Sequence, residues 1–187
     1  METKDKSFNF KVFSVGMTKE ITLQRLKRIG IIYNEEVKLK HAGLSKFYVD
    51  VKLSSGYTEI LKMLADDLWE IMDKNMTCVV SQGYGGLPLS TAIAVMHNVP
   101  HQTFVRDKPK DHGPKKGSLL EGYEPNENDL LAIVDDVGTT GESLLENINV
   151  VRSSGAEIVG AYTVVKRGDF ELGKVPYKWL FVPEDFL

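Results

Sequence analysis

The second half of the chain alternates short apolar runs with amphipathic stretches. The apolar runs predict strands at 77–81, 101–106, 130–135, 157–165 and 177–182. Residues 87–96 and 142–153 instead place apolar side chains three or four positions apart, which predicts helices. Because strand–helix–strand units join parallel neighbours, we expect an α/β fold with an open, central parallel sheet flanked by helices.

The N-terminal part of the chain follows other patterns. Residues 18–29 and 57–72 are amphipathic at helical spacing, with Thr18 as the expected cap of the first helix. Residues 37–40 and 46–52 alternate between apolar and polar side chains on either side of a small turn, which predicts a two-stranded hairpin. We expect these elements to form a small N-terminal hood over the core.

Composition narrows the class of protein. The 187 residues suit one domain, 1–187, with the hood at about 1–75 and the core at about 76–187. The net charge of −3 argues against nucleic acid as a partner. No apolar run reaches the roughly 18 residues of a membrane span, and no signal-peptide pattern follows Met1. The single Cys78 suits a reducing compartment, so we expect a cytoplasmic protein.

The most informative stretch runs from Leu131 to Ser143. An apolar strand ends in Asp135 and Asp136, and a loop of Gly, Thr and Ser then leads directly into a helix. Free N–H groups at a helix N-terminus favour a phosphate, and carboxylates can hold sugar hydroxyls or a hydrated Mg²⁺. An ordinary helix cap would use the same residue types, but two adjacent carboxylates repel each other unless a cation or a donor is present. A ribose phosphate is therefore the expected ligand.

Two further segments extend this site. Residues 83–86 are rich in glycine and follow a strand, so we expect them to form a loop that holds a second phosphate group. Two phosphate sites around a sugar site fit phosphoribosyl pyrophosphate (PRPP). Residues 107–129 form a long polar connection after Arg106, and we expect its cations to stabilise the leaving pyrophosphate while the loop keeps water out.

The stretch 131–143 resembles the PRPP signature of type I phosphoribosyltransferases, in which the paired acids bind the ribose hydroxyls and the loop binds the 5′-phosphate. It departs from the family at Glu142, where small residues are common. Arg106 with Lys110-Asp111-His112-Gly113 resembles the catalytic loop of the orotate phosphoribosyltransferases. That loop implies a homodimer in which each subunit reaches into the neighbouring site.

The same resemblance extends to the base site. Residues 38–50 are similar to the segment of the family that binds the pyrimidine, so Lys40 would contact the base or pyrophosphate and Phe47 or Tyr48 would cover the ring. Arg167 closes a strand at the ligand edge and resembles the orotate-binding arginine, since a guanidinium suits a planar carboxylate. Lys166 stands where the family has Asp, and Asp107 stands where it often has Lys.

The resemblance implies Mg²⁺-dependent transfer of the phosphoribosyl group from PRPP to orotate, which yields orotidine 5′-phosphate and pyrophosphate in pyrimidine (UMP) biosynthesis. The implied catalytic residues are Asp136, Lys110 and His112. The implied PRPP contacts are Lys40, Tyr84, Gly85, Arg106, Lys108, Lys110, His112, Asp135, Asp136, Val137, Gly138, Thr139, Thr140, Gly141, Glu142 and Ser143. The implied orotate contacts are Phe47, Tyr48, Thr139 and Arg167. No direct protein ligand to Mg²⁺ is expected, because PRPP would carry the ion near Asp135 and Asp136.

Two other functions fit the same PRPP parts. A purine phosphoribosyltransferase would differ in the base pocket, where a neutral purine gives no reason for the guanidinium of Arg167. A non-catalytic, PRPP-sensing regulator would need a nucleic-acid-binding module or a basic RNA face. Both alternatives stay open at the level of the sequence.

Overall fold

A computed structural model describes residues 15–29, 37–39, 43–45 and 49–186. The helices are α1 (Val15–Ile29), α2 (Val51–Ser55), α3 (Thr58–Ile71), α4 (Gly83–His97) and α5 (Glu142–Val151), with 3₁₀ turns at η1 (Arg152–Ser154) and η2 (Pro183–Phe186). The strands are β1 (Val37–Leu39), β2 (Gly43–Ser45), β3 (Cys78–Gln82), β4 (His101–Val105), β5 (Leu120–Gly122), β6 (Leu130–Gly138), β7 (Glu157–Lys166) and β8 (Tyr177–Phe181).

A six-stranded sheet in the order β5-β4-β3-β6-β7-β8 forms the centre of the molecule. Its neighbours are parallel from β4 to β8, which confirms the predicted α/β class and the edge position of β8. The other edge strand, β5, is antiparallel to β4 and lies within residues 107–129, where we expected only a polar connection. That expectation was wrong because three residues are too few to show a periodic pattern.

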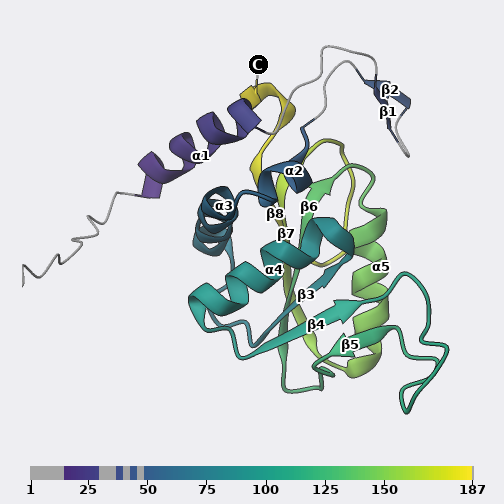
Figure 1. Cartoon of the computed structure of the whole chain (residues 1–187). Coiled ribbons are helices and arrows are strands. Elements are labelled where there is room, and N and C mark those ends of the chain that lie inside the picture. The colour runs from purple at the N-terminus through teal and green to yellow at the C-terminus, as the bar shows by residue number, and fades with distance from the viewer. Residues whose placement is uncertain (1–14, 30–36, 40–42, 46–48, 187) are drawn as a thin grey trace, which may run out of the picture.

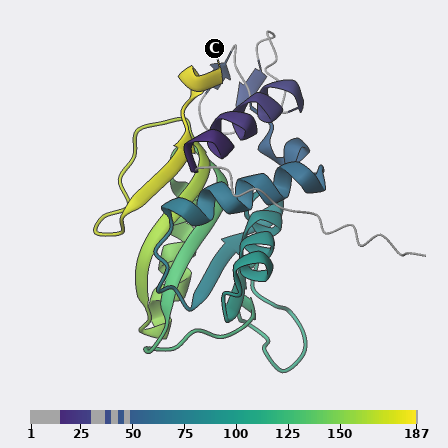
Figure 2. The same cartoon turned by 90° about the vertical axis from the view of Figure 1, so that its left-hand side faces the viewer.

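Helices cover both faces of the sheet. Helices α1 to α4 lie on one side and α5 on the other (Figures 1 and 2). Strand β6 supplies both cores: Ala132 and Val134 pack under α4, whereas Leu131 and Ile133 pack under α5. Side chains alternate along a strand, so an apolar run buries itself on both faces at once.

The N-terminal elements differ from the prediction at two points. Helix α1 begins at Val15, so Thr18 lies inside it and does not cap it. The hairpin exists, but its second strand is Gly43–Ser45, and part of the predicted strand 46–52 forms helix α2 instead. Asp50 ends the extended chain there, because its Oδ1 accepts a hydrogen bond of 2.9 Å from the Leu53 N–H and caps the new helix.

Helix α4 begins at Gly83, four residues before the predicted start, so residues 83–86 form its first turn and not a loop. The glycines there serve close packing. A Cβ on Gly86 would lie 2.6 Å from the Val134 carbonyl oxygen, and a Cβ on Gly85 would overlap the carboxylate of Asp136. Glycine therefore lets the start of α4 approach the end of β6 closely. From the sequence we had interpreted these glycines as the sign of an open phosphate loop.

Other sequence expectations are confirmed. Cys78 is fully buried in β3, and Trp69 packs against the core from α3. Within the described part of the chain, no helix combines the length and apolar character that a bilayer crossing requires.

Ile148 joins α5 to the sheet and tests the packing directly. Its side chain is fully buried, so Ile148→Ala should lower the free energy of unfolding by about 2–5 kcal/mol through lost burial and a cavity. Urea denaturation measures this change. Glu146→Ala, an exposed position on the same helix, is the matched control and should change stability by less than about 0.5 kcal/mol. An equal effect of both substitutions would contradict the described packing of α5.

Candidate active site

The two acidic residues at the carboxyl end of β6 face opposite sides of the sheet. From Leu131 to Val134, odd-numbered residues of β6 face α5 and even-numbered residues face α4, as the two cores show. Asp135 therefore points toward α5 and Asp136 toward α4, and both are more than nine-tenths buried. The prediction ended this strand at Asp135, whereas β6 continues to Gly138, so both acids lie within the strand.

Asp135 is held by donors alone. Its Oδ2 accepts a hydrogen bond of 2.8 Å from the Ser143 hydroxyl, and its Oδ1 accepts one of 2.8 Å from the Asp136 N–H. Burial, and next the negative charge of Asp136, raises the pKa of Asp135 to about 7. The Ser143 hydroxyl was expected to donate to a phosphate; here its single proton is engaged by the carboxylate.

Asp136 has a cationic partner that the sequence did not reveal. The Lys52 ammonium, from helix α2, lies 2.6 Å from Asp136 Oδ2.

 The sequence pattern placed Lys52 in the predicted strand 46–52, where it showed no link to Asp136. On the other side of Asp136, the first turn of α4 closes against Oδ1 at Gly85.

The loop between β6 and α5 has the geometry of a helix N-terminus. Gly141 adopts φ 78°, a conformation that favours glycine, and directly precedes the ten-residue helix α5. Thr139 and Thr140 are half-buried and Glu142 is exposed at the first turn. Free N–H groups at this end of α5 can receive a phosphate.

Residues 167–170 pack against the loop between β6 and α5. Phe170 lies so close that a Cβ on Gly141 would be 2.5 Å from its ring and one on Gly138 would be 2.8 Å from it. The Arg167 N–H donates a hydrogen bond of 2.8 Å to the Gly138 carbonyl oxygen. These contacts tie residues 167–170 to residues 138–141, a link between distant parts of the chain that local sequence patterns do not reveal.

Sheet register brings the other predicted residues to the same edge. Val137 of β6 pairs with Val165 of β7, so Arg167 emerges beside the loop. On the opposite flank, Val105 of β4 pairs with Gln82 of β3, and Arg106 follows directly. Neighbouring strands are about 4.8 Å apart, so the starting points of these segments are neighbours across the sheet edge. Tyr84, at the start of α4, is 89% exposed.

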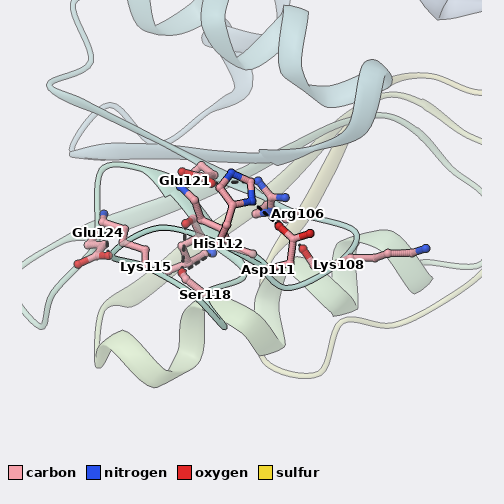
Figure 3. A network of polar contacts seen from close by, with 10 residues as sticks. Arg106, Lys108, Asp111, His112, Lys115, Ser118, Glu121 and Glu124 are labelled. Atoms are coloured by element: carbon pink, nitrogen blue, oxygen red, sulfur yellow. Dashed lines mark hydrogen bonds and ion pairs between the residues drawn. The ribbon is translucent and has the colours of Figure 1, made fainter.

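The segment between β4 and β5 is organised by Glu121, which the sequence analysis missed. Glu121 Oε1 lies 2.9 Å from Arg106 Nη1 and 3.1 Å from Lys110 Nζ (Figure 3). The hydrogen bond from Lys110 is the main cause that lowers the pKa of Glu121. Two cations that we expected to bind pyrophosphate therefore share one carboxylate.

The backbone of this segment forms a hairpin that projects from the body of the molecule (Figures 1 and 2). The Lys110 N–H donates to Ser118 at 2.9 Å, and the Gly117 N–H donates to Lys110 at 2.7 Å. His112 is exposed and contacts Asp111, while the side chain of Lys108 points away from the network (Figure 3). The expected cations thus lie on one projecting arm.

Three predicted site residues, Lys40, Phe47 and Tyr48, lie outside the described residues. The proposed role of this segment in binding the base stays a prediction.

The acidic pair suits an ion that arrives with its own oxygen ligands. In the described ranges, no group of three or more His, Cys, Asp or Glu side chains could hold a metal. Mg²⁺ prefers an octahedral shell of oxygens and keeps waters or substrate phosphates in it. Asp135 and Asp136 would therefore need oxygen ligands from a bound molecule to complete such a shell.

The raised pKa of Asp135 makes stability depend on pH. The native state binds this proton up to about pH 7 and the unfolded chain loses it near pH 4, so the free energy of unfolding should fall as pH rises between these values. Asp135→Asn removes this slope and should stabilise the protein relative to wild type at about pH 8. Urea denaturation at several pH values measures both. Glu171→Gln, at an exposed position, is the control, and an unchanged slope in Asp135→Asn would contradict the raised pKa.

Comparisons with known proteins agree with this geometry. No protein-family model matches the chain. The chain is 34% identical over 142 residues to the orotate phosphoribosyltransferase of Methanocaldococcus jannaschii, and the match covers 76% of this chain and 78% of that protein.

Two solved structures of the Mycobacterium tuberculosis orotate phosphoribosyltransferase share the fold. The complex with Fe(III) dicitrate is 23% identical with a TM-score of 0.73, and it covers 90% of this chain and 98% of that one. The complex with PRPP is 22% identical with a TM-score of 0.69, at 90% and 98% coverage. On the identity and coverage of the archaeal relative, the chain belongs to the orotate phosphoribosyltransferase family.

Proposed function

We propose that this protein transfers the phosphoribosyl group of PRPP to N1 of orotate and releases pyrophosphate. The observation that carries the proposal is the buried Asp135–Asp136 pair, which lies near the carboxyl end of β6, one short loop before the N-terminus of α5. Ligands of open α/β sheets bind at this edge. Membership of the orotate phosphoribosyltransferase family supports the choice of reaction.

The sugar phosphate is assigned to the end of β6. The N–H groups of residues 138–143 and the hydroxyls of Thr139 and Thr140 bind the 5′-phosphate, and Asp135 and Asp136 accept hydrogen bonds from the ribose hydroxyls. Mg²⁺, carried by PRPP, would neutralise charge on the pyrophosphate. Tyr84 and Gly85, at the start of α4, are placed beside the pyrophosphate.

The leaving group is assigned to the projecting hairpin. As the bond between C1′ and the pyrophosphate oxygen breaks, negative charge grows on pyrophosphate, and Arg106, Lys108, Lys110 and His112 stabilise it. The bond from N1 of orotate to C1′ forms as N1 gives up its proton, which the departing pyrophosphate takes up. Closure of the hairpin would exclude water, which would otherwise capture the cationic sugar.

If the projecting hairpin serves the site of a neighbouring subunit, the protein must act as a homodimer. The hairpin projects away from its own subunit, as an arm that serves a neighbouring site would (Figures 1 and 2). An apolar groove of about 530 Å³ between α3 and α4, lined by Leu61, Leu87, Pro88 and Val95 among others, offers a surface that a second copy can cover.

The base is assigned to Arg167 and Thr139, together with Phe47 and Tyr48. Arg167 emerges beside the loop at the end of β6, where a guanidinium can pair with the orotate carboxylate. A purine lacks this carboxylate, so the arginine favours orotate. The buried, unpaired thiol of Cys78 accords with a cytoplasmic location.

The reaction is tested by pyrophosphate release. Protein, PRPP and Mg²⁺ are mixed in turn with orotate, uracil, adenine, hypoxanthine or xanthine, and we expect release with orotate alone. Asp135→Asn with Asp136→Asn should lower the rate by at least about 100-fold, because the ribose loses both negatively charged acceptors. Release with a purine but not with orotate would favour the purine enzyme, and no release with any base would favour the regulator. Near-normal turnover by the double variant would contradict the role of the pair.

The shared hairpin is tested by mixing two inactive variants. One carries Asp136→Asn and the other carries Lys110→Ala with His112→Ala, so a mixed dimer has one site with intact parts from both subunits. After exchange of subunits, activity should return to about a quarter of the wild-type value, because half of the dimers are mixed. Each variant alone is the control. No recovery, in a mixture shown to contain mixed dimers, would place the hairpin in its own subunit's site.

A further inference from the structure

The aromatic ring of Phe170 lies directly against the loop between β6 and α5. It faces two glycines of that loop, since a Cβ on Gly141 would lie 2.5 Å from the ring and one on Gly138 would lie 2.8 Å from it. Gly141, at φ 78°, is also the residue that leads the chain into α5. A side chain at either position would push the loop and the ring apart, so the glycines allow a contact that holds the backbone of the loop in place.

Phe170 is itself supported by the edge of the sheet. Its ring is tilted against the ring of Tyr177 in β8, with 4.9 Å between the two centroids. The hydroxyls of Tyr177 and Thr163 share a hydrogen bond of 2.7 Å, and Thr163 is fully buried in β7. Thr163 pairs with Asp135 of β6 in the sheet. The contacts therefore form a closed path from β6 through β7 and β8 back to the loop that follows β6.

The segment that carries Phe170 also carries Arg167. The Arg167 N–H donates a hydrogen bond of 2.8 Å to the Gly138 carbonyl oxygen. Between these contacts, a Cβ on Gly168 would overlap the carbonyl oxygen of Thr139, so the two backbones lie side by side without room for a side chain. The arginine assigned to the base and the loop assigned to the 5′-phosphate are thus joined along their whole contact, by a backbone hydrogen bond at one end and by an aromatic ring at the other.

We propose that Phe170 is a positioning residue that holds the phosphate loop against the segment of Arg167, and so fixes the separation between the 5′-phosphate and the base. The proposal rests on the proposed function, since it takes this loop as the phosphate site and Arg167 as the base site. Phe170 acts through the backbone of the loop and takes no part in bond breaking. Backbone N–H groups stabilise a phosphate only when they point toward it, so the affinity depends on a support that binds nothing itself.

Binding of ribose 5-phosphate, measured by isothermal titration calorimetry, tests this without a base and without turnover. Phe170→Ala should weaken binding by about 10-fold or more, because the N–H groups of the loop are no longer held in position. Phe170→Leu keeps part of the apolar bulk and should lose less. Leu172→Ala is the matched control, because it removes a buried side chain of the same segment that packs into the core under α5. It should bind as wild type does, at a temperature at which urea denaturation shows every variant to be folded.

Equal binding by wild type and Phe170→Ala would overturn the proposal. An equal loss in Leu172→Ala would overturn it as well, because the effect would then come from stability alone. If Phe170→Ala does not fold, Phe170→Leu decides by the same two criteria. No binding by wild type would instead contradict the assigned phosphate site, so a failure of the proposed function is distinguished from a failure of the role of Phe170.

Steady-state kinetics give the second readout. Phe170→Ala should raise the KM for PRPP and the KM for orotate together, each by about 10-fold, with a smaller change in kcat, because one contact holds both parts of the site. Trp179→Ala removes the next aromatic ring along β8, which lies 5.2 Å from the ring of Tyr177, and should change neither KM. A rise in the KM for PRPP alone would contradict the link to the base site, and a fall in kcat with both KM values unchanged would contradict a positioning role.

Discussion

The two-residue period of strand β6 is the constraint on which the rest of the structure depends. The strand is buried on both faces, so its alternating side chains must fill two cores that lie under different helices. The same alternation sends Asp135 toward α5 and Asp136 toward α4. A shift of β6 by one residue would exchange both cores and both acids, so packing in the interior sets the position of the polar groups at the edge.

Much of the core could be predicted because its signals are local. A short apolar run such as Leu131–Val134 is typical of a strand buried on both faces, and the helical spacing around Leu144 and Ile148 identifies α5. The acidic pair and the glycine–threonine loop stand next to each other in the chain, so the sugar-phosphate site was visible as one continuous motif.

The missed features depend on contacts between distant segments. Lys52 and Asp136 are 84 residues apart in the sequence. The alternation around Val49 and Val51 is typical of a strand, but Asp50 caps helix α2 there. The glycines at the start of α4 serve the close approach to β6, a need that exists only in three dimensions. Glu121 lies in the segment 107–129, which shows no periodic pattern in the sequence. Its partners Arg106 and Lys110 are brought to it by the pairing of β5 with β4.

The shared carboxylate of Glu121 also affects how the projecting hairpin would respond to its surroundings. Arg106 and Lys110 already have an anion, so their transfer to pyrophosphate exchanges one counter-ion for another. Screening by salt weakens the old and the new ion pairs alike. Closure of the hairpin should therefore depend less on ionic strength than the number of its cations suggests.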